Sequence, residues 1–148
     1  MRAVVTRVDS ASVEIAGKIH GQIGRGFLVL LGVHEDDTEN EAKKVADKIC
    51  GLRIFEDEEG KINVNPVNAG AASLLIISQF TLFADCRSRR PGFSHAARPE
   101  AAIPLYELVI DECRARGFRV ETGVFGEKML VSSVNEGPFT IILDTKEL

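Results

Sequence analysis

The sequence contains few cysteines and none of the spacings that cysteine-based sites require. Cys50, Cys86 and Cys113 are widely spaced, and no two of them form a Cys-x-x-Cys pair. An odd number of isolated cysteines argues against both a disulfide framework and a zinc site. We therefore expect all three thiols to be reduced.

Long apolar runs are also missing. No stretch approaches the roughly 18 apolar residues that a membrane-spanning helix needs. The first ten residues mix charged groups with valine and lack the apolar centre of a signal peptide. We expect a soluble, cytoplasmic protein without a membrane partner. A length of 148 residues with 45% hydrophobic content suits one compact domain, residues 1–148.

The usual hydrolytic constellations are absent as well. His20, His34 and His95 are far apart in the sequence and form no His-x-His or His-Glu-x-x-His pattern, so a zinc-activated water is not predicted. The acidic residues 56–59 lack the spacing of a calcium loop and are typical of a solvated turn. No Gly-x-Ser-x-Gly elbow occurs. We predict neither a metal site nor a cofactor.

A basic surplus, the usual mark of a nucleic-acid-binding protein, is not present. The formal net charge is -4, which argues mildly against RNA. Four arginines nevertheless fall within twelve residues: Arg87, Arg89, Arg90 and Arg98. Such a patch suits contact with one end of an RNA, and it equally suits a solvated loop with scattered ion pairs.

Apolar patterning predicts the strands. Two continuous runs, residues 27–33 and 73–83, are typical of strands covered on both faces. Shorter runs predict further strands over residues 1–8, 11–15, 19–23, 52–55, 61–64, 118–124, 128–134 and 139–143.

Two helices are predicted between these strands. Thr38 and Glu41 have the spacing of a capping box, and apolar residues follow at helical spacing until Gly51. A second helix begins at Pro99, or at Pro104 if that proline marks its true start, and ends near residue 117. The order of elements predicts an α/β domain with a mixed sheet.

Two short polar segments are candidates for a site. Ser78, Gln79 and Thr81 come at the carboxyl end of an apolar strand, where ligands of α/β sheets gather. Gly137-Pro138 lies between two apolar stretches. A cis bond there would turn neighbouring carbonyls to one side and make an acceptor edge for a substrate ammonium. The alternative is an ordinary turn between strands.

Together, residues 78–82 and 135–140 resemble the D-aminoacyl-tRNA deacylases, editing esterases that remove D-amino acids from mischarged tRNA. The resemblance covers the whole chain. It includes residues 7–13, 24–33 and 52–55, and the pattern Phe125, Gly126 and Met129. The chain departs from the family pattern at Glu136 and Phe139 around the Gly-Pro, and at Glu127 and Lys128.

The resemblance implies a fold with strands and helices in the order β(2)-(βα)2-β(3). It implies hydrolysis of D-aminoacyl-tRNA, and of glycyl-tRNA mischarged on tRNA(Ala), with a Gly-cisPro motif that rejects L-amino acids. The RNA assists catalysis, because the terminal ribose carries a vicinal hydroxyl that can activate water. The enzyme then needs positioning and an oxyanion donor, most plausibly the main-chain N–H of Phe80 or Thr81.

The same resemblance assigns the other site residues and the assembly. Ser78 to Thr81 form the catalytic segment, and Asn135, Gly137 and Pro138 bind substrate. Phe125 and Met129 line the pocket for the terminal adenine, or else belong to the core. Arg7 lies near the Gly-Pro edge, or else is a surface charge. A homodimer places the Gly137-Pro138 element of one subunit in the site of the other.

Two alternatives stay open at this point. The hydroxyl of Ser78 or Thr81 is a nucleophile only if a base lies nearby, and the local sequence supplies none. The chain as a whole is either this esterase or a non-catalytic module that binds RNA or oligomerises.

Overall fold

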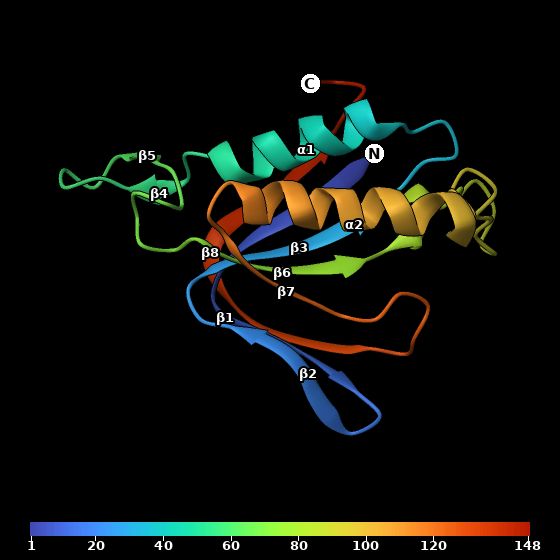
Figure 1. Ribbon diagram of the computed structural model, residues 1–148, viewed down its shortest axis with the longest axis horizontal. Helices are drawn as coiled ribbons and strands as arrows, with labels where there is room; N and C mark the ends of the chain where they lie inside the picture. The colour runs from blue at the N-terminus through green and yellow to red at the C-terminus, as the bar shows by residue number, and fades with distance from the viewer.

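The long strand β1 (Arg2–Ile15) is the centre of a six-stranded sheet in the computed structural model, which covers residues 1–148. It pairs antiparallel with β2 (Lys18–Ile23), β3 (Gly26–Gly32) and β8 (Leu130–Asp144). Its first half lies between β3 and β8, and its second half lies between β2 and β8 (Figure 1). One strand therefore pairs with three others.

The other half of the sheet is parallel. β6 (Ser73–Ser78) runs parallel to β3, and β7 (Arg119–Thr122) runs parallel to β6. Leu74 and Ile76 face the core under the helices, whereas Leu75 and Ile77 face a second core cluster on the opposite side. Because neighbouring side chains alternate between faces, burial on both sides requires the continuous apolar run that the sequence shows. The predicted mixed-sheet α/β fold is confirmed.

Two helices cover one face of the sheet and pack against each other (Figure 1). α1 (Glu39–Gly51) begins with the predicted capping box, in which the Thr38 N–H donates to the Glu41 carboxylate over 2.7 Å. α2 (Pro99–Ala115) begins at Pro99, and Pro104 lies inside it. None of the helices is both long and apolar enough to cross a membrane.

Two predicted strand breaks do not occur. Residues 1–8 and 11–15 belong to the single strand β1, and residues 128–134 and 139–143 merge into β8. The reason is that β1 and β8 pair along almost their entire lengths, from Arg2 opposite Asp144 to Glu14 opposite Leu130. The chain therefore closes with two strands instead of three, and Gly137-Pro138 is not a turn between strands.

Two other segments are shorter than predicted. The strand expected over residues 73–83 ends at Ser78, and a 3₁₀ helix, η1 (Phe80–Phe83), follows it. Residues 52–64 form only a small hairpin of β4 (Phe55–Glu56) and β5 (Ile62–Val64), which projects from the body of the molecule (Figure 1).

Candidate functional site

The Gly137-Pro138 peptide lies in a wide bulge of β8. Thr6 of β1 faces Thr140 of β8, and Val8 faces Asn135. The single residue Arg7 is therefore opposite four residues, 136–139. The Gly137-Pro138 bond is cis, and both residues are exposed. The bulge thus presents main chain to solvent from the middle of a strand.

Arg7 holds this bulge in place through hydrogen bonds and a ring contact. Its Nε donates to the main-chain oxygen of Glu136 over 3.2 Å, and its Nη1 donates to the oxygen of Ile54 over 2.6 Å. Both terminal nitrogens donate to the Glu56 carboxylate over 3.1 Å, and the guanidinium lies 4.4 Å from the centre of the Phe139 ring. Only 2% of Arg7 is exposed, so the interpretation as a surface charge is wrong.

Further polar contacts complete the network around Arg7. The Asn135 side chain donates to the main-chain oxygen of Arg7 over 3.0 Å. Arg25 pairs with the Glu136 carboxylate at 3.2 Å. Hydrogen bonds from the main chain of Glu56 and from Arg7 hold the pKa of the Glu56 carboxyl below its ordinary value. The two residues before Gly137 are therefore tied to Arg7 and Arg25.

The second predicted segment lies where β6 ends. The N–H of Gln79 donates to the oxygen of Leu31 over 2.8 Å, and the first hydrogen bond of η1 runs from Leu82 N–H to Gln79 oxygen over 3.2 Å. Phe80 and Thr81 precede that bond, so their N–H groups have no partner inside the 3₁₀ helix. A Cβ at Gly32 would lie 2.9 Å from the Gln79 oxygen, so this close approach requires glycine.

Neither hydroxyl in this segment has a base beside it. The Thr81 hydroxyl accepts a hydrogen bond from the Gln79 side-chain amide, and an amide cannot take up a proton. No imidazole or carboxylate hydrogen-bonds Ser78 or Thr81. An activated nucleophile needs such a partner.

Four predicted residues do line one small pocket: Ser78, Gln79, Phe80 and Phe125. Tyr106 of α2, which the sequence analysis did not single out, lines it too; its hydroxyl donates to the oxygen of Ile76 over 2.7 Å. Burial raises the pKa of Tyr106. In the sequence, only the position of Tyr106 on the apolar face of a predicted helix could have indicated that it lies near the site. The open volume is about 10 Å³, which is room for about one water molecule.

Phe125 and Met129 pack against different core clusters. Phe125 packs beside the core under the helices, with its ring centre 6.4 Å from that of Tyr106. Met129 packs against the second core cluster, and its sulfur leaves no room for a Cβ at Gly123. The prediction that Phe125 and Met129 line one adenine pocket stays a prediction.

The two polar segments are far apart within one chain. The bulge is opposite Arg7, Arg7 pairs with Phe27 of β3, and Phe27 pairs with Leu74 of β6. Ser78 lies four residues further along β6, so the segments are separated by three strand spacings and four residues. These steps correspond to roughly 14 Å across the sheet and 13 Å along it. A single chain does not assemble one site from both segments.

Two of the three histidines are neighbours in space, although they are far apart in the sequence. His34 forms a β-bridge with Ala96, which places its ring 6.1 Å from that of His95, centre to centre. The third, His20, lies apart on β2.

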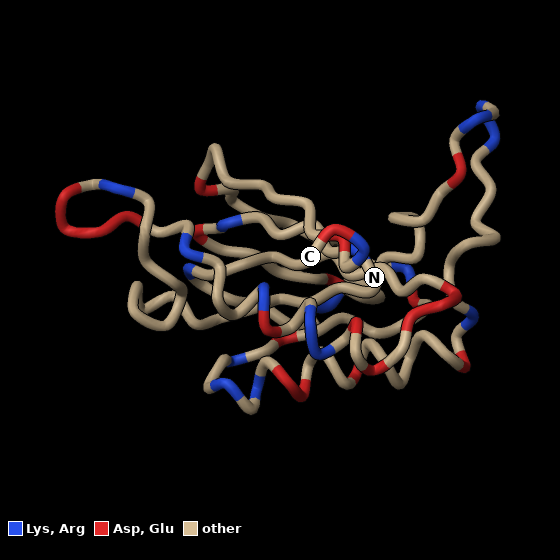
Figure 2. The backbone as a smooth tube through the Cα atoms, turned by 90° about the horizontal axis from the view of Figure 1, so that it is seen from above, with Lys and Arg blue, Asp and Glu red and all other residues tan.

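Three of the four arginines, Arg87, Arg89 and Arg90, lie on a protruding loop, residues 84–95, called here the arginine loop, whereas Arg98 caps the start of α2. Figure 2 shows blue segments at its tip. Arg87 pairs with Asp85 at 2.5 Å, whereas Arg89 and Arg90 are exposed and make no ion pair. Main-chain bonds between Asp85 and Gly92, of 2.8 and 3.0 Å, close the loop.

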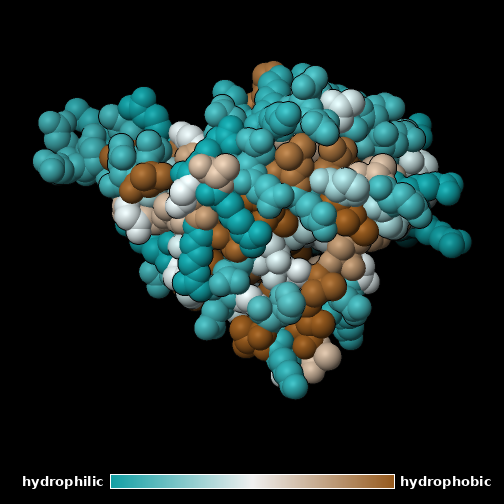
Figure 3. Space-filling model, viewed as in Figure 1, coloured by the Kyte–Doolittle hydropathy of each residue, from teal (hydrophilic) through white to brown (hydrophobic).

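Large apolar side chains are exposed along β8. Leu130 is 58% exposed, Val134 56% and Ile142 72%, and Ile19 of the neighbouring β2 is 55% exposed. Figure 3 shows apolar groups on the lower part of the molecule, where β2 and the first half of β8 lie in Figure 1. A row of such residues over paired strands is typical of an interaction surface.

The sequence matches known proteins along nearly its whole length. The family described as D-Tyr-tRNA(Tyr) deacylase matches residues 4–144. The D-aminoacyl-tRNA deacylase of Koribacter versatilis (strain Ellin345) is 55% identical over 148 residues, covering 99% of both proteins. That of Thermus aquaticus is 51% identical over 148 residues, covering 99% of this chain and 97% of the relative.

Solved structures agree with this fold. One described as c-Myc DNA Unwinding Element Binding Protein has a TM-score of 0.90 at 38% identity, over 97% of this chain and 98% of that one. One described as a probable eukaryotic D-amino acid tRNA deacylase has a TM-score of 0.83 at 20% identity, over 96% and 97%. The likeness to the second structure, at 20% identity, supports the fold alone. On the full-length matches, the chain belongs to the D-Tyr-tRNA(Tyr) deacylase family.

Proposed function

We propose that this chain edits aminoacyl-tRNA by cleaving the ester between the tRNA 3' end and a D-amino acid, or glycine mischarged on tRNA(Ala). Relatives more than half identical over their full length carry the name D-aminoacyl-tRNA deacylase, and the chain is an ester hydrolase of that class. The reaction uses neither metal nor cofactor, and product release leaves free amino acid and intact tRNA.

The observation that carries the proposal is the β8 bulge held by Arg7. Gly137 and Pro138 are exposed, while the residues before them are fixed by a buried guanidinium and by the Asn135 amide. Such an edge accepts the α-ammonium of an aminoacyl ester in one orientation, and Gly137 offers no side chain to obstruct it. An L-residue directs its Cβ into the rigid main chain at Pro138, whereas a D-residue directs it away. Glycine has no Cβ and passes.

The main-chain donors of η1 supply the second contact. The N–H of Phe80 or Thr81 stabilises the developing oxyanion, a contribution of about 3 kcal/mol for one well-placed donor. The vicinal hydroxyl of the terminal ribose activates the attacking water, so no side-chain base is needed. This division of roles is consistent with the absence of a base beside Ser78 and Thr81.

The complete site needs a second copy of the chain. The bulge and η1 are about 20 Å apart within one protomer, because three strand spacings and four residues along β6 separate them. A homodimer that covers the exposed apolar residues of β8 brings the bulge of one protomer to the η1 segment of its partner. The small open volume beside Ser78 also suggests that a single protomer lacks a full substrate cleft.

The test is a comparison of four substrates: D-tyrosyl-, glycyl-, L-alanyl- and L-tyrosyl-tRNA. We expect hydrolysis of the first two and sparing of the last two. Equal cleavage of D- and L-tyrosyl-tRNA would refute the role of Gly137 and Pro138. Resistance of glycyl-tRNA would show that selection rests on contacts to the D side chain. Turnover that persists in EDTA excludes a metalloesterase, and no turnover at all supports the rival, a non-catalytic RNA-binding or oligomerising module.

Gly137→Ala gives a sharper test. The added Cβ meets no atom beyond its chain neighbours closer than 3.9 Å within this chain, so the fold can accept it. We expect unchanged thermal stability and a fall of at least tenfold in kcat/KM for D-tyrosyl-tRNA, about 1.4 kcal/mol. Gly24→Ala is the matched control, since a Cβ there meets nothing within 4 Å and the residue lies outside the bulge. Sedimentation of the wild type tests the dimer; an active monomer would contradict the shared site.

A further inference from the structure

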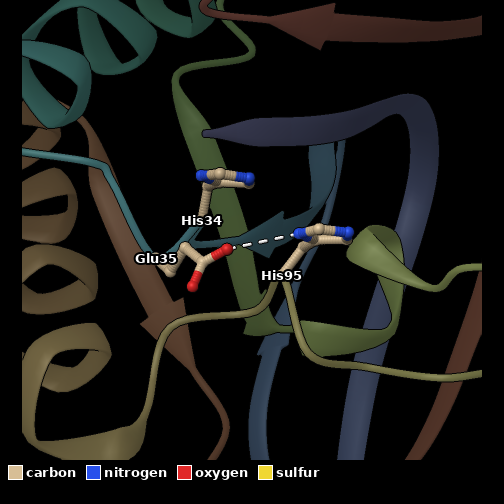
Figure 4. Close-up of side chains that lie close together, drawn as sticks. All are labelled: His34, Glu35 and His95. Carbon is tan, nitrogen blue, oxygen red and sulfur yellow. Dashed lines mark hydrogen bonds and ion pairs between the residues drawn. The ribbon is translucent and has the colours of Figure 1, made fainter.

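Main-chain hydrogen bonds hold His34 and Glu35 beside His95. His34, just after the end of β3, forms an antiparallel bridge with Ala96, and the Glu35 N–H donates to the His95 oxygen over 3.0 Å. Figure 4 shows the three side chains side by side on these two segments, with the Glu35 carboxylate bonded to the His95 ring. The backbone therefore holds the two segments that carry these side chains next to each other.

The three side chains offer the ligand set of a zinc site. One ligand atom from each of His34, Glu35 and His95 lies within 4.8 Å of the others. Two imidazoles and a carboxylate bind Zn²⁺ at about 2.0–2.2 Å, which places tetrahedral ligand atoms roughly 3.4 Å apart. The ligand atoms must therefore move closer together to bind the ion. The side chains of His95 and Glu35 can rotate to do so, because they are 55% and 50% exposed.

His34 is the fixed member of the cluster. Its side chain is 11% exposed, and its ring packs edge-on against the Phe83 ring at 5.0 Å. Nδ1 accepts the Asp36 N–H over 3.2 Å, which leaves Nε2 as the nitrogen free for a metal. With Nε2 bound to a metal, the ring proton lies on Nδ1, so the ring gives up the contact with the Asp36 N–H and donates instead to the Asp36 carboxylate, 3.6 Å away. In many proteins, a carboxylate that accepts a hydrogen bond from the ring nitrogen opposite the metal orients the metal-bound histidine.

The surrounding charges do not oppose a cation. The pocket containing both histidines is also lined by Arg2, Arg87 and Lys146. Asp144 pairs with Arg2 at 2.7 Å, and Asp85 pairs with Arg87 at 2.5 Å, so two of these three cations are already neutralised. The single carboxylate of the cluster, that of Glu35, offsets the charge of the third.

We propose that His34, Glu35 and His95 bind one divalent transition-metal ion of the Zn²⁺ class, with at least one coordination position open to water. The ion ties the end of β3 to the base of the arginine loop and takes no part in ester hydrolysis. Mg²⁺ and Ca²⁺ do not compete, because they prefer oxygen ligands.

The test uses the full-length, metal-free protein with Zn²⁺ or Co²⁺ alone. We expect calorimetry to find one Zn²⁺ bound per chain. Bound Co²⁺ should give the visible absorption spectrum of an ion with few ligands. The melting temperature of the protein should rise with either ion. His95→Ala and Glu35→Gln alter exposed side chains and leave the fold intact. Each should weaken binding by about 100-fold or more, and Asp36→Asn by about 10- to 100-fold.

His20→Ala and Cys86→Ser are the controls, because each removes an exposed potential ligand elsewhere. Unchanged Zn²⁺ affinity in both controls supports the site. Loss of binding in Cys86→Ser, undiminished binding in the His95→Ala, Glu35→Gln double variant, or equal binding of Mg²⁺ would each overturn it. So would the absence of any stoichiometric Zn²⁺ binding to the wild type.

Discussion

The Arg7 guanidinium donates from Nε to the main-chain oxygen of Glu136 over 3.2 Å, directly before Gly137-Pro138. The donor lies in β1 and the acceptor lies 129 residues later in β8. The same guanidinium holds the oxygen of Ile54 and the carboxylate of Glu56. One buried side chain thus connects the exposed bulge to the rest of the fold.

Arg7→Lys should therefore lower both stability and selectivity. Lysine lacks the fork that reaches Glu136, Ile54 and Glu56 together, and a buried acceptor left without a partner costs about 1–3 kcal/mol. Chemical unfolding measures the first effect, and the ratio of D- to L-tyrosyl-tRNA cleavage measures the second. Arg119→Lys, at an exposed position of β7, is the control. A selectivity ratio that stays at the wild-type value would show that Arg7 does not position the bulge.

Thr81→Ala and Ser78→Ala should each retain activity within about tenfold of the wild type. The proposed oxyanion donor is a main-chain N–H, which truncation of either side chain preserves. Single-turnover kinetics with D-tyrosyl-tRNA is the measurement. A loss of roughly 10⁴-fold in kcat from Thr81→Ala, with an unchanged melting temperature, would identify a nucleophile instead.

A D-tyrosyl-tRNA whose terminal ribose lacks the 2' hydroxyl, with the amino acid on the 3' oxygen, should bind but turn over very slowly. The vicinal hydroxyl is the group that activates water in the proposed mechanism, and no protein base replaces it. Binding and turnover are measured separately, beside the same substrate with normal ribose. Equal turnover of the two substrates would place the general base on the protein.

The hydrogen bonds that the Glu56 carboxylate accepts from its own main chain and from Arg7 should make stability depend on pH in acid. The folded-state pKa of Glu56 lies below its ordinary value of 4.5. Its contribution is therefore fully present above the unfolded pKa and is lost as pH falls through the lower, folded pKa. Urea unfolding at pH 7 and at several values below 4.5 should show wild type more stable than Glu56→Gln at neutral pH, with the difference shrinking in acid. A difference independent of pH would mean that the charge of Glu56 contributes nothing.

Local sequence decided the elements whose hydrogen bonds and packing are local. The capping box of Thr38 and Glu41 spans four residues and was predictable because both partners lie in one helical turn. The apolar run of residues 74–77 required a strand buried on both faces. The segments around Ser78 and Gly137 were likewise visible in the sequence, through their residue types and family pattern.

Tertiary pairing decided the rest. β8 continues through Gly137-Pro138 because β1 supplies hydrogen bonds on both sides of the bulge, and no local pattern contains that partner. Arg7 is buried because its acceptors come from residues 47 to 129 positions away. His34 and His95 meet because one main-chain bridge joins the segments that carry them. Contacts between segments so distant in sequence leave no periodicity or spacing to read, so only the folded chain brings these groups together.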